Sequence, residues 1–102
     1  MEQLSMFDSL EMIPEEEMVR QIGEALGIKF TYREDWKEWQ YKIKKVTLSV
    51  HYERYTCHDL YGERFIGVST SHSLGGSSGP MDSIEEAVNF AREGMKNLGI
   101  EL

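Results

Sequence analysis

The chain has 102 residues, an apolar fraction of 40%, a charged fraction of 28% and a formal net charge of -7 at pH 7. This composition is typical of one folded globular domain and unlike that of disordered, collagen-like or membrane-embedded chains. Because binding to the phosphates of DNA or RNA depends on clustered positive charge, the acidic balance argues against direct nucleic-acid binding.

Residues 1 to 13 are predicted to form an N-terminal tail or arm, followed by a single α+β domain over residues 14 to 102. Six acidic residues and no basic residue occur among the first 17 positions. Three apolar side chains, Leu4, Met6 and Phe7, nevertheless stand in this acidic tail. Such side chains lower solubility unless they find a pocket in the same chain or in a partner.

Two helices are predicted at the ends of the domain. The first, over residues 14 to 26, starts with a proline and three glutamates that suit a helix N-terminus, and Gly27 suits its end. The second starts at a capping box in which Ser83 is the N-cap and Glu86 lies three residues on. An apolar stripe follows, and Gly99 with the isoleucine after it is typical of a Schellman ending.

Between the helices, apolar residues at every second position predict β-strands. The alternating sets are Phe30 and Tyr32; Trp39, Tyr41 and Ile43; Val46, Leu48, Val50 and Tyr52; and Ile66 and Val68. The odd-numbered set ends at Ile43 and an even-numbered set starts at Val46, so we expect a turn near Lys44 and Lys45. We interpret residues 75 to 80, Gly-Gly-Ser-Ser-Gly-Pro, as a flexible loop into the last helix.

The predicted order is therefore α-β-β-β-β-α. It fits a two-layer sandwich in which an antiparallel sheet of three to four strands carries both helices on one face. The order resembles that of the double-stranded RNA-binding domain, which has a helix, three strands and a helix. In that family lysines at the start of the last helix bind phosphates, whereas this chain has Asp82, Glu85 and Glu86 there. The resemblance is thus one of topology and implies no RNA binding.

The tail carries the one motif with a functional parallel. Gln3-Leu4-Ser5-Met6-Phe7 resembles the short peptide by which bacterial DNA polymerases, repair proteins and phage replication proteins dock onto the β sliding clamp, in its favoured form Gln-Leu-Ser/Asp-Leu-Phe. Met6 in place of leucine is a near-isosteric apolar change. The resemblance implies that Gln3 bonds near the pocket rim, Leu4 enters one apolar subsite, Met6 and Phe7 fill another, and Ser5 is a spacer. Residues 8 to 13 could span roughly 20 Å between this peptide and the body.

The apolar residues of the tail have a second interpretation. They could pack as an edge strand or arm on the domain's own core, or in a homodimer, because apolar termini are often tied down in this way. The protein would then be an acidic adaptor or inhibitor of another protein. Both interpretations place it among interaction proteins, and the clamp-docking one places it in bacterial or phage DNA metabolism.

Other candidate sites are weaker. His51, Cys57, His58 and His72 include metal-ligating side chains, but their spacing fits no zinc motif, so we expect neither a metal site nor a cofactor. No pattern of paired acids or of an activated nucleophile predicts an enzyme.

Two further patterns resemble binding sites but have simpler structural explanations. The Gly-rich stretch from residue 75 lacks the lysine of a phosphate-binding loop. The aromatic residues Trp36, Trp39, Tyr41, Tyr52 and Tyr55, with Lys42, Lys44 and Arg54, could stack on nucleic-acid bases. They are more typical of a sheet face covered by helices, with Trp36 at a turn.

The cellular location is inferred from features that the sequence lacks. No apolar run approaches the roughly 20 residues of a membrane-spanning helix, and the N-terminus is acidic where a secretory signal would be basic. Cys57 is the single cysteine, so no internal disulfide can form. We expect a cytoplasmic protein without a membrane partner.

Overall fold

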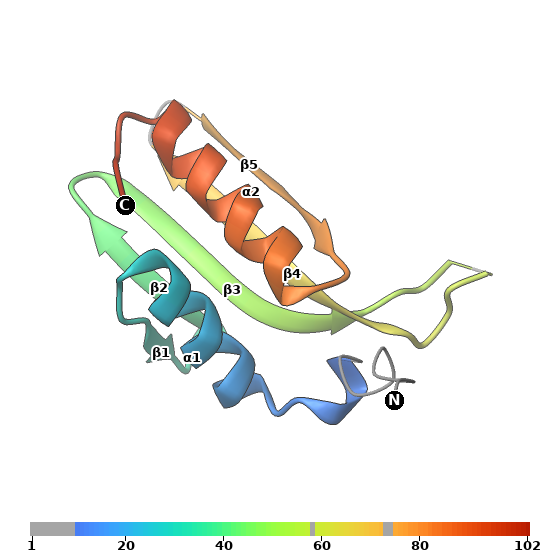
Figure 1. The fold of residues 1–102 in the computed structure, drawn as a ribbon. Coiled ribbons are helices and arrows are strands. Elements are labelled where there is room, and N and C mark those ends of the chain that lie inside the picture. The colour runs from blue at the N-terminus through green and yellow to red at the C-terminus, as the bar shows by residue number, and fades with distance from the viewer. Residues whose placement is uncertain (1–9, 58, 73–74) are drawn as a thin grey trace.

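The computed structural model of the chain describes residues 10–57, 59–72 and 75–102. Its elements are η2 (Leu10–Met12), α1 (Glu15–Leu26), β1 (Thr31–Arg33), β2 (Glu38–Ile43), β3 (Val46–Arg54), β4 (Arg64–His72), β5 (Gly75–Met81) and α2 (Ile84–Asn97). The strands form one antiparallel sheet in the order β1-β2-β3-β4-β5, and both helices cover the same face of it (Figure 1). The α+β class and the antiparallel sheet are confirmed, but the sheet has five strands where the sequence predicted three to four.

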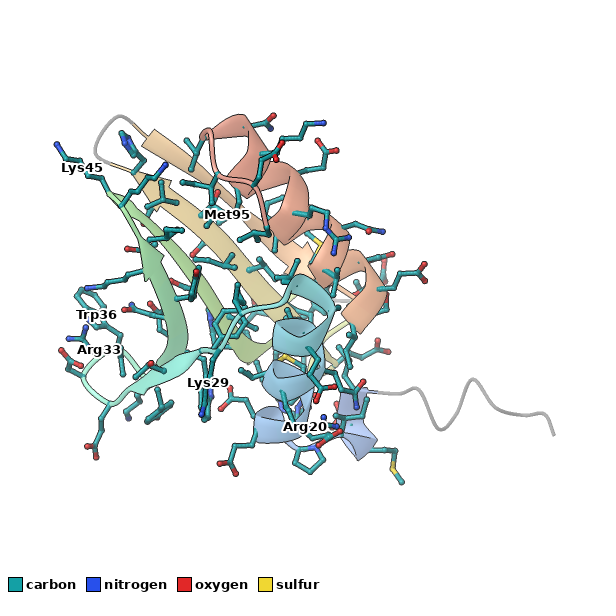
Figure 2. The ribbon with its side chains drawn as sticks, turned by 60° about the vertical axis from the view of Figure 1, so that its left-hand side comes forward. Arg20, Lys29, Arg33, Trp36, Lys45 and Met95 are labelled. Carbon is teal, nitrogen blue, oxygen red and sulfur yellow. The ribbon has the colours of Figure 1, made fainter. Side chains whose placement is uncertain are left out.

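The core lies between the helices and the sheet, as the apolar periods predict. Residues with at most 1% exposure come from both layers: Met18 and Ile22 of α1, Ala87, Ala91 and Met95 of α2, and Leu48, Val50, Ile66 and Val68 of the sheet. In the register, Trp39 pairs with Val50 and Val50 with Val68, so these side chains share one face. Figure 2 shows Met95 between its helix and the strands.

The helix ends form as the sequence predicts. The Glu86 backbone N–H donates to Ser83 Oγ at 3.1 Å, which closes the N-cap of α2. At the other end, the Ile100 N–H donates to the Met95 carbonyl oxygen at 2.8 Å, and Gly99 has the positive φ of a Schellman ending. α1 begins at Glu15, directly after Pro14, and Gly27 caps its C-terminal end with a positive φ of 75°.

The Gly-rich stretch from residue 75 is the main difference from the predicted fold. The structure forms it into β5, whose register with β4 includes Ser69 opposite Ser78 and Gly67 opposite Pro80. The flexible-loop prediction was therefore wrong. Glycine and serine lower the intrinsic strand propensity, but pairing with β4 supplies backbone hydrogen bonds that the local sequence does not reveal. A proline is tolerated here because β5 is an edge strand.

A second glycine brings α2 close to the sheet. A Cβ atom at Gly94 would lie 2.9 Å from Thr70 Cγ2, closer than side chains pack, and Thr70 is 2% exposed. The missing side chain thus lets the helix backbone approach β4. No helix among the described residues is both long and apolar enough to cross a membrane.

Candidate partner-binding region

The pentapeptide Gln3–Phe7 lies outside the described residues, as do Asp8 and Ser9. What the structure shows is the place where this segment joins the body. The first described residue, Leu10, begins the short helix η2, which lies beside the base of the hairpin formed by β3 and β4 (Figure 1). The geometry of this junction determines where any ligand of the pentapeptide must lie.

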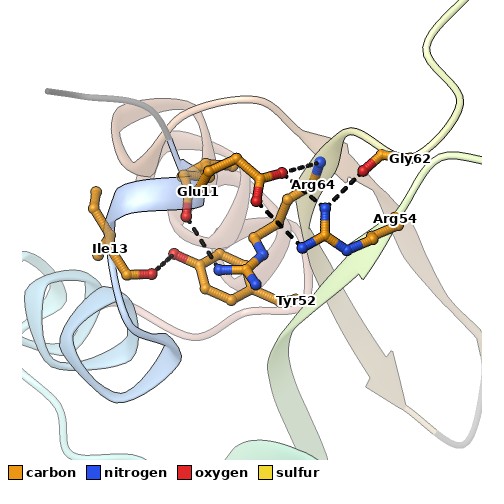
Figure 3. Close-up of polar contacts among 7 residues, drawn as sticks. Glu11, Ile13, Tyr52, Arg54, Gly62 and Arg64 are labelled. Carbon is orange, nitrogen blue, oxygen red and sulfur yellow. Dashed lines mark hydrogen bonds and ion pairs between the residues drawn. The ribbon is translucent and has the colours of Figure 1, made fainter. Parts of the chain in front are cut away.

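Leu10 is part of the hydrophobic core, with 5% exposure. Its carbonyl oxygen accepts a hydrogen bond from Arg64 Nη1 at 3.2 Å. Ile13 packs against the same core, and its carbonyl oxygen accepts from the Tyr52 hydroxyl at 2.8 Å (Figure 3). Residues 10 to 13 are therefore fixed to the sheet, and we call this segment the anchor. The spacer between the pentapeptide and the body is shorter than the six residues predicted from the sequence.

Glu11 forms the polar part of this anchor. Its carboxylate accepts from Arg54 Nη1 at 2.8 Å and Nη2 at 3.2 Å, and from the Arg64 backbone N–H at 3.2 Å (Figure 3). The hydrogen bond from Arg54 holds the pKa of Glu11 below its ordinary value, and the same contact raises the pKa of Arg54. Arg54 Nη1 also donates to the Gly62 carbonyl oxygen at 2.6 Å, so one guanidinium joins η2 to the hairpin.

Arg64 stacks over the ring of Tyr52, with its Cζ atom 4.4 Å from the ring centroid. Partial burial raises the pKa of Tyr52, and the positive charge of Arg64 opposes this shift. The phenol is thus neutral at physiological pH and remains a hydrogen-bond donor to Ile13. A cation over an aromatic face is favourable, and it fixes the planar guanidinium in place.

A hollow of about 450 Å³ opens beside this anchor. It is lined by Leu10, Tyr55 and Leu60, by the acidic residues Glu11, Glu63 and Asp82, and by the basic Arg64. Leu60 belongs to the hairpin tip, whose base is held by hydrogen bonds from the Tyr55 N–H to the Glu63 carbonyl oxygen and from the Gly62 N–H to the Tyr55 carbonyl oxygen. The hollow is therefore open and partly apolar, and its lining carries more negative than positive charge.

The hairpin tip also exposes apolar surface. Leu60 is 39% exposed and Tyr61 is 75% exposed. The sequence patterns predict no contact surface at this stretch. An adjacent leucine and tyrosine in an otherwise polar loop was the signal available for a contact surface.

A second hollow, of about 540 Å³, lies along α1 and is lined by apolar residues that include Val19, Phe30 and Trp39. Charged residues of the same helix, Glu16, Glu24 and Arg20, contribute to its lining. Arg20 is engaged by ion pairs to Glu17 and Glu24. No motif in the sequence marked this groove, since it arises where a helix meets the edge of the sheet.

The metal-ligating residues that the sequence singled out are dispersed. His51 contacts Glu53 on β3, Cys57 is exposed in the β3–β4 hairpin, and His72 ends β4. His58 lies outside the described residues. Over the described ranges, no group of three or more histidine, cysteine, aspartate or glutamate side chains could hold a metal ion.

The aromatic residues do not form one exposed platform. Trp39, Tyr41 and Tyr52 pack against the core on the helix side of the sheet. Trp36 is 67% exposed at the β1–β2 turn, on the opposite side of the molecule from η2 (Figure 2). For these three strand residues the arrangement matches the interpretation of a sheet face covered by helices, whereas Tyr55 stacks against the ring of Phe65 instead. The first turn of α2 carries Glu85 and Glu86, which would repel phosphates.

The described fold and junction define the class as a small α+β protein with a two-layer architecture and an N-terminal segment anchored beside a hairpin. Comparison with known proteins adds no family to this description: no family model, no curated protein and no solved structure matches the chain.

Proposed function

We propose that this protein is a non-enzymatic interaction protein that docks onto the bacterial β sliding clamp through Gln3, Leu4, Ser5, Met6 and Phe7. The observation that carries the proposal is the pentapeptide itself, which matches the clamp-binding form at four positions and has an isosteric change at the fifth. Phe7 is expected to contribute most to the binding energy, because aromatic side chains bury a large area at few rotatable bonds and dominate binding hot spots.

The position of the peptide in the chain supports this function. Leu10 is buried in the body and Glu11 is held by Arg54, so the pentapeptide joins the domain at a fixed point. Only two residues, Asp8 and Ser9, separate it from that point. The domain can therefore occupy the surface next to the clamp pocket while the peptide fills it, and so recruit or block another clamp ligand.

A second candidate is an acidic adaptor or inhibitor in which the N-terminal segment belongs to the protein's own core or to a homodimer. The observation that favours it is the burial of Leu10, which shows that part of the sequence expected to form the tail belongs to the core. The net charge of -7 would then direct the protein to a basic partner.

One pair of substitutions separates the two functions. Leu4→Ala with Phe7→Ala is expected to lower affinity for purified bacterial sliding clamp by about a hundredfold or more, which is the usual effect of removing hot-spot anchors. Thermal unfolding of the same variant should stay unchanged. Trp36→Ala is the control, because it removes an exposed aromatic side chain from the β1–β2 turn and not from the peptide.

Two results would contradict clamp docking. One is wild-type protein that does not bind the clamp in a calorimetric titration. The other is a double variant that binds as tightly as wild type. A fall in melting temperature or dissociation of a dimer in the double variant would instead support the second candidate.

A further inference from the structure

We propose that the tip of the β3–β4 hairpin, through Leu60 and Tyr61, forms a second contact with the sliding clamp. This inference rests on the proposed function, because it concerns the same partner. It adds a surface that the peptide motif does not include and that the structure places beside the attachment point of the peptide.

The first step is the length of chain between peptide and body. Three Cα–Cα steps join Phe7 to Leu10, and these span at most about 11 Å in any conformation. Leu10 is fixed, since it is buried and its carbonyl oxygen is bonded to Arg64. Any pocket that takes Phe7 therefore lies within this distance of the anchor.

The second step is what surrounds the anchor. Leu10 and Leu60 line the same hollow of about 450 Å³. A folded chain of 100 residues has a radius of gyration of about 13 Å, so a protein that holds Phe7 is wider than the spacer is long. Its surface therefore lies close to the part of the body around Leu10, and the hairpin residue Leu60 belongs to that part.

The third step is that the hairpin tip has the chemistry of an interface. Tyr61 is 75% exposed and Leu60 39% exposed, which leaves apolar surface uncovered in the described structure. Tyrosine is enriched at protein interfaces because its ring is rigid and its hydroxyl can bond at the rim. Three carboxylates and one guanidinium, that of Arg64, line the hollow, and this excess of negative charge favours a basic side chain of the clamp beside an apolar one.

The fourth step is that the hairpin is held in position relative to the peptide. Arg54 bonds both Glu11 of η2 and the carbonyl oxygen of Gly62 in the hairpin. The Tyr55 N–H donates to the Glu63 carbonyl oxygen at 2.8 Å, which extends strand pairing beyond β3 and β4. A preformed second contact adds affinity without the cost of ordering a loop.

The test measures the affinity of the full chain for purified bacterial sliding clamp in four variants. Leu60→Ser with Tyr61→Ser is expected to weaken binding about tenfold, a loss typical of one well-placed contact. Trp36→Ser is the matched control and should bind like wild type, since it also removes an exposed aromatic ring. Leu4→Ala with Phe7→Ala reports on the peptide alone.

The single variant Tyr61→Ser guards against misfolding of the double variant, because this side chain is mostly in solvent. It should weaken binding several-fold with an unchanged circular dichroism spectrum. Wild-type affinity in both hairpin variants, with binding abolished in the peptide variant, would overturn this inference and leave the docking peptide intact.

Tighter binding by the hairpin variants would also overturn the inference, since the hairpin would then cover the chain's own N-terminal segment. Failure of wild-type protein to bind the clamp would overturn the proposed function and this inference together. The outcomes therefore distinguish a failed second contact from a failed partner.

Discussion

Tyr52 and Ile13, 39 positions apart in the chain, are joined by a hydrogen bond of 2.8 Å from the tyrosine hydroxyl to the isoleucine carbonyl oxygen. This bond ties the segment before α1 to the central strand β3. Together with the contact of Glu11 with Arg54, it fixes the point at which the N-terminal segment that carries the pentapeptide joins the domain. The candidate partner-binding region therefore depends on interactions that can be tested one at a time.

Tyr52→Phe removes the hydroxyl and leaves the ring in place. We expect the free energy of unfolding to fall by about 1 kcal/mol, the usual net contribution of one hydrogen bond in a partly buried position. Urea denaturation followed by circular dichroism measures this change. Tyr61→Phe is the matched control, since Tyr61 is 75% exposed, and it should leave stability unchanged. Equal stability of the two variants would contradict a structural role for the Tyr52 hydroxyl.

The contact of Glu11 with Arg54 predicts a pH-dependent stability. The pKa of Glu11 in the folded state lies below its ordinary value of 4.5, mainly because of the hydrogen bond from Arg54. A depressed folded-state pKa stabilises the fold above the unfolded-state value, and this stabilisation is lost as pH falls through the folded-state value. Glu11→Gln should therefore be less stable than wild type at pH 7, and the difference should shrink below pH 4.5.

Denaturation of both proteins at pH 7 and at pH 3 tests this prediction. The effect should be small, because both side chains are about half exposed and solvent screens the pair. Adding salt at pH 7 should reduce it further. A stability difference that is the same at both pH values would show that the carboxylate charge has no part in the anchor.

The parts of the fold that the sequence predicts correctly are those with a local signal. Ser83 and Glu86 are three residues apart, and the helix cap that they form does not depend on contacts with distant parts of the chain. The alternation from Val46 to Val50 places those side chains on one face because the strand period is two. Such patterns need no knowledge of the rest of the molecule.

The parts that the sequence missed are decided by distant residues. β5 has no apolar alternation, and it becomes a strand because β4 pairs with it, with Thr70 opposite Ser77 for example. Leu10 is one apolar residue in an acidic stretch; its side chain packs in the core, and its carbonyl oxygen is bonded by Arg64, 54 positions away. Neither contact produces a periodic pattern in the sequence, so residue periodicity could predict neither β5 nor the anchor.

Gly94 in α2 gives a prediction about the packing of helix on sheet. Through its higher helix propensity, alanine at position 94 would stabilise the helix by about 1 kcal/mol relative to glycine. The added Cβ atom, however, would lie 2.9 Å from Thr70 Cγ2. Thr70 is β-branched and buried, so it cannot move aside easily, and overpacking of this kind costs about 1–3 kcal/mol. We expect the overpacking to dominate and the variant to be less stable than wild type.

The control for this variant is Asn89→Ala, an exposed position on the same helix, which should be slightly stabilising. The two alanine substitutions are therefore expected to shift the urea midpoint in opposite directions. A stabilising Gly94→Ala would mean that α2 does not approach β4 as closely as the structure shows.

Leu10 and Met12 provide the sharpest test of the anchor, because they are two apolar residues of the same short helix with opposite burial. Leu10 is 5% exposed within the core, whereas Met12 is 67% exposed. Leu10→Ala should lower the free energy of unfolding by about 2–3 kcal/mol, through lost burial and a cavity that closes only partly. Met12→Ala should change it by less than about 0.5 kcal/mol. If the two variants were equally stable, Leu10 would not be part of the core, and the peptide would join the body at a later residue than the structure shows.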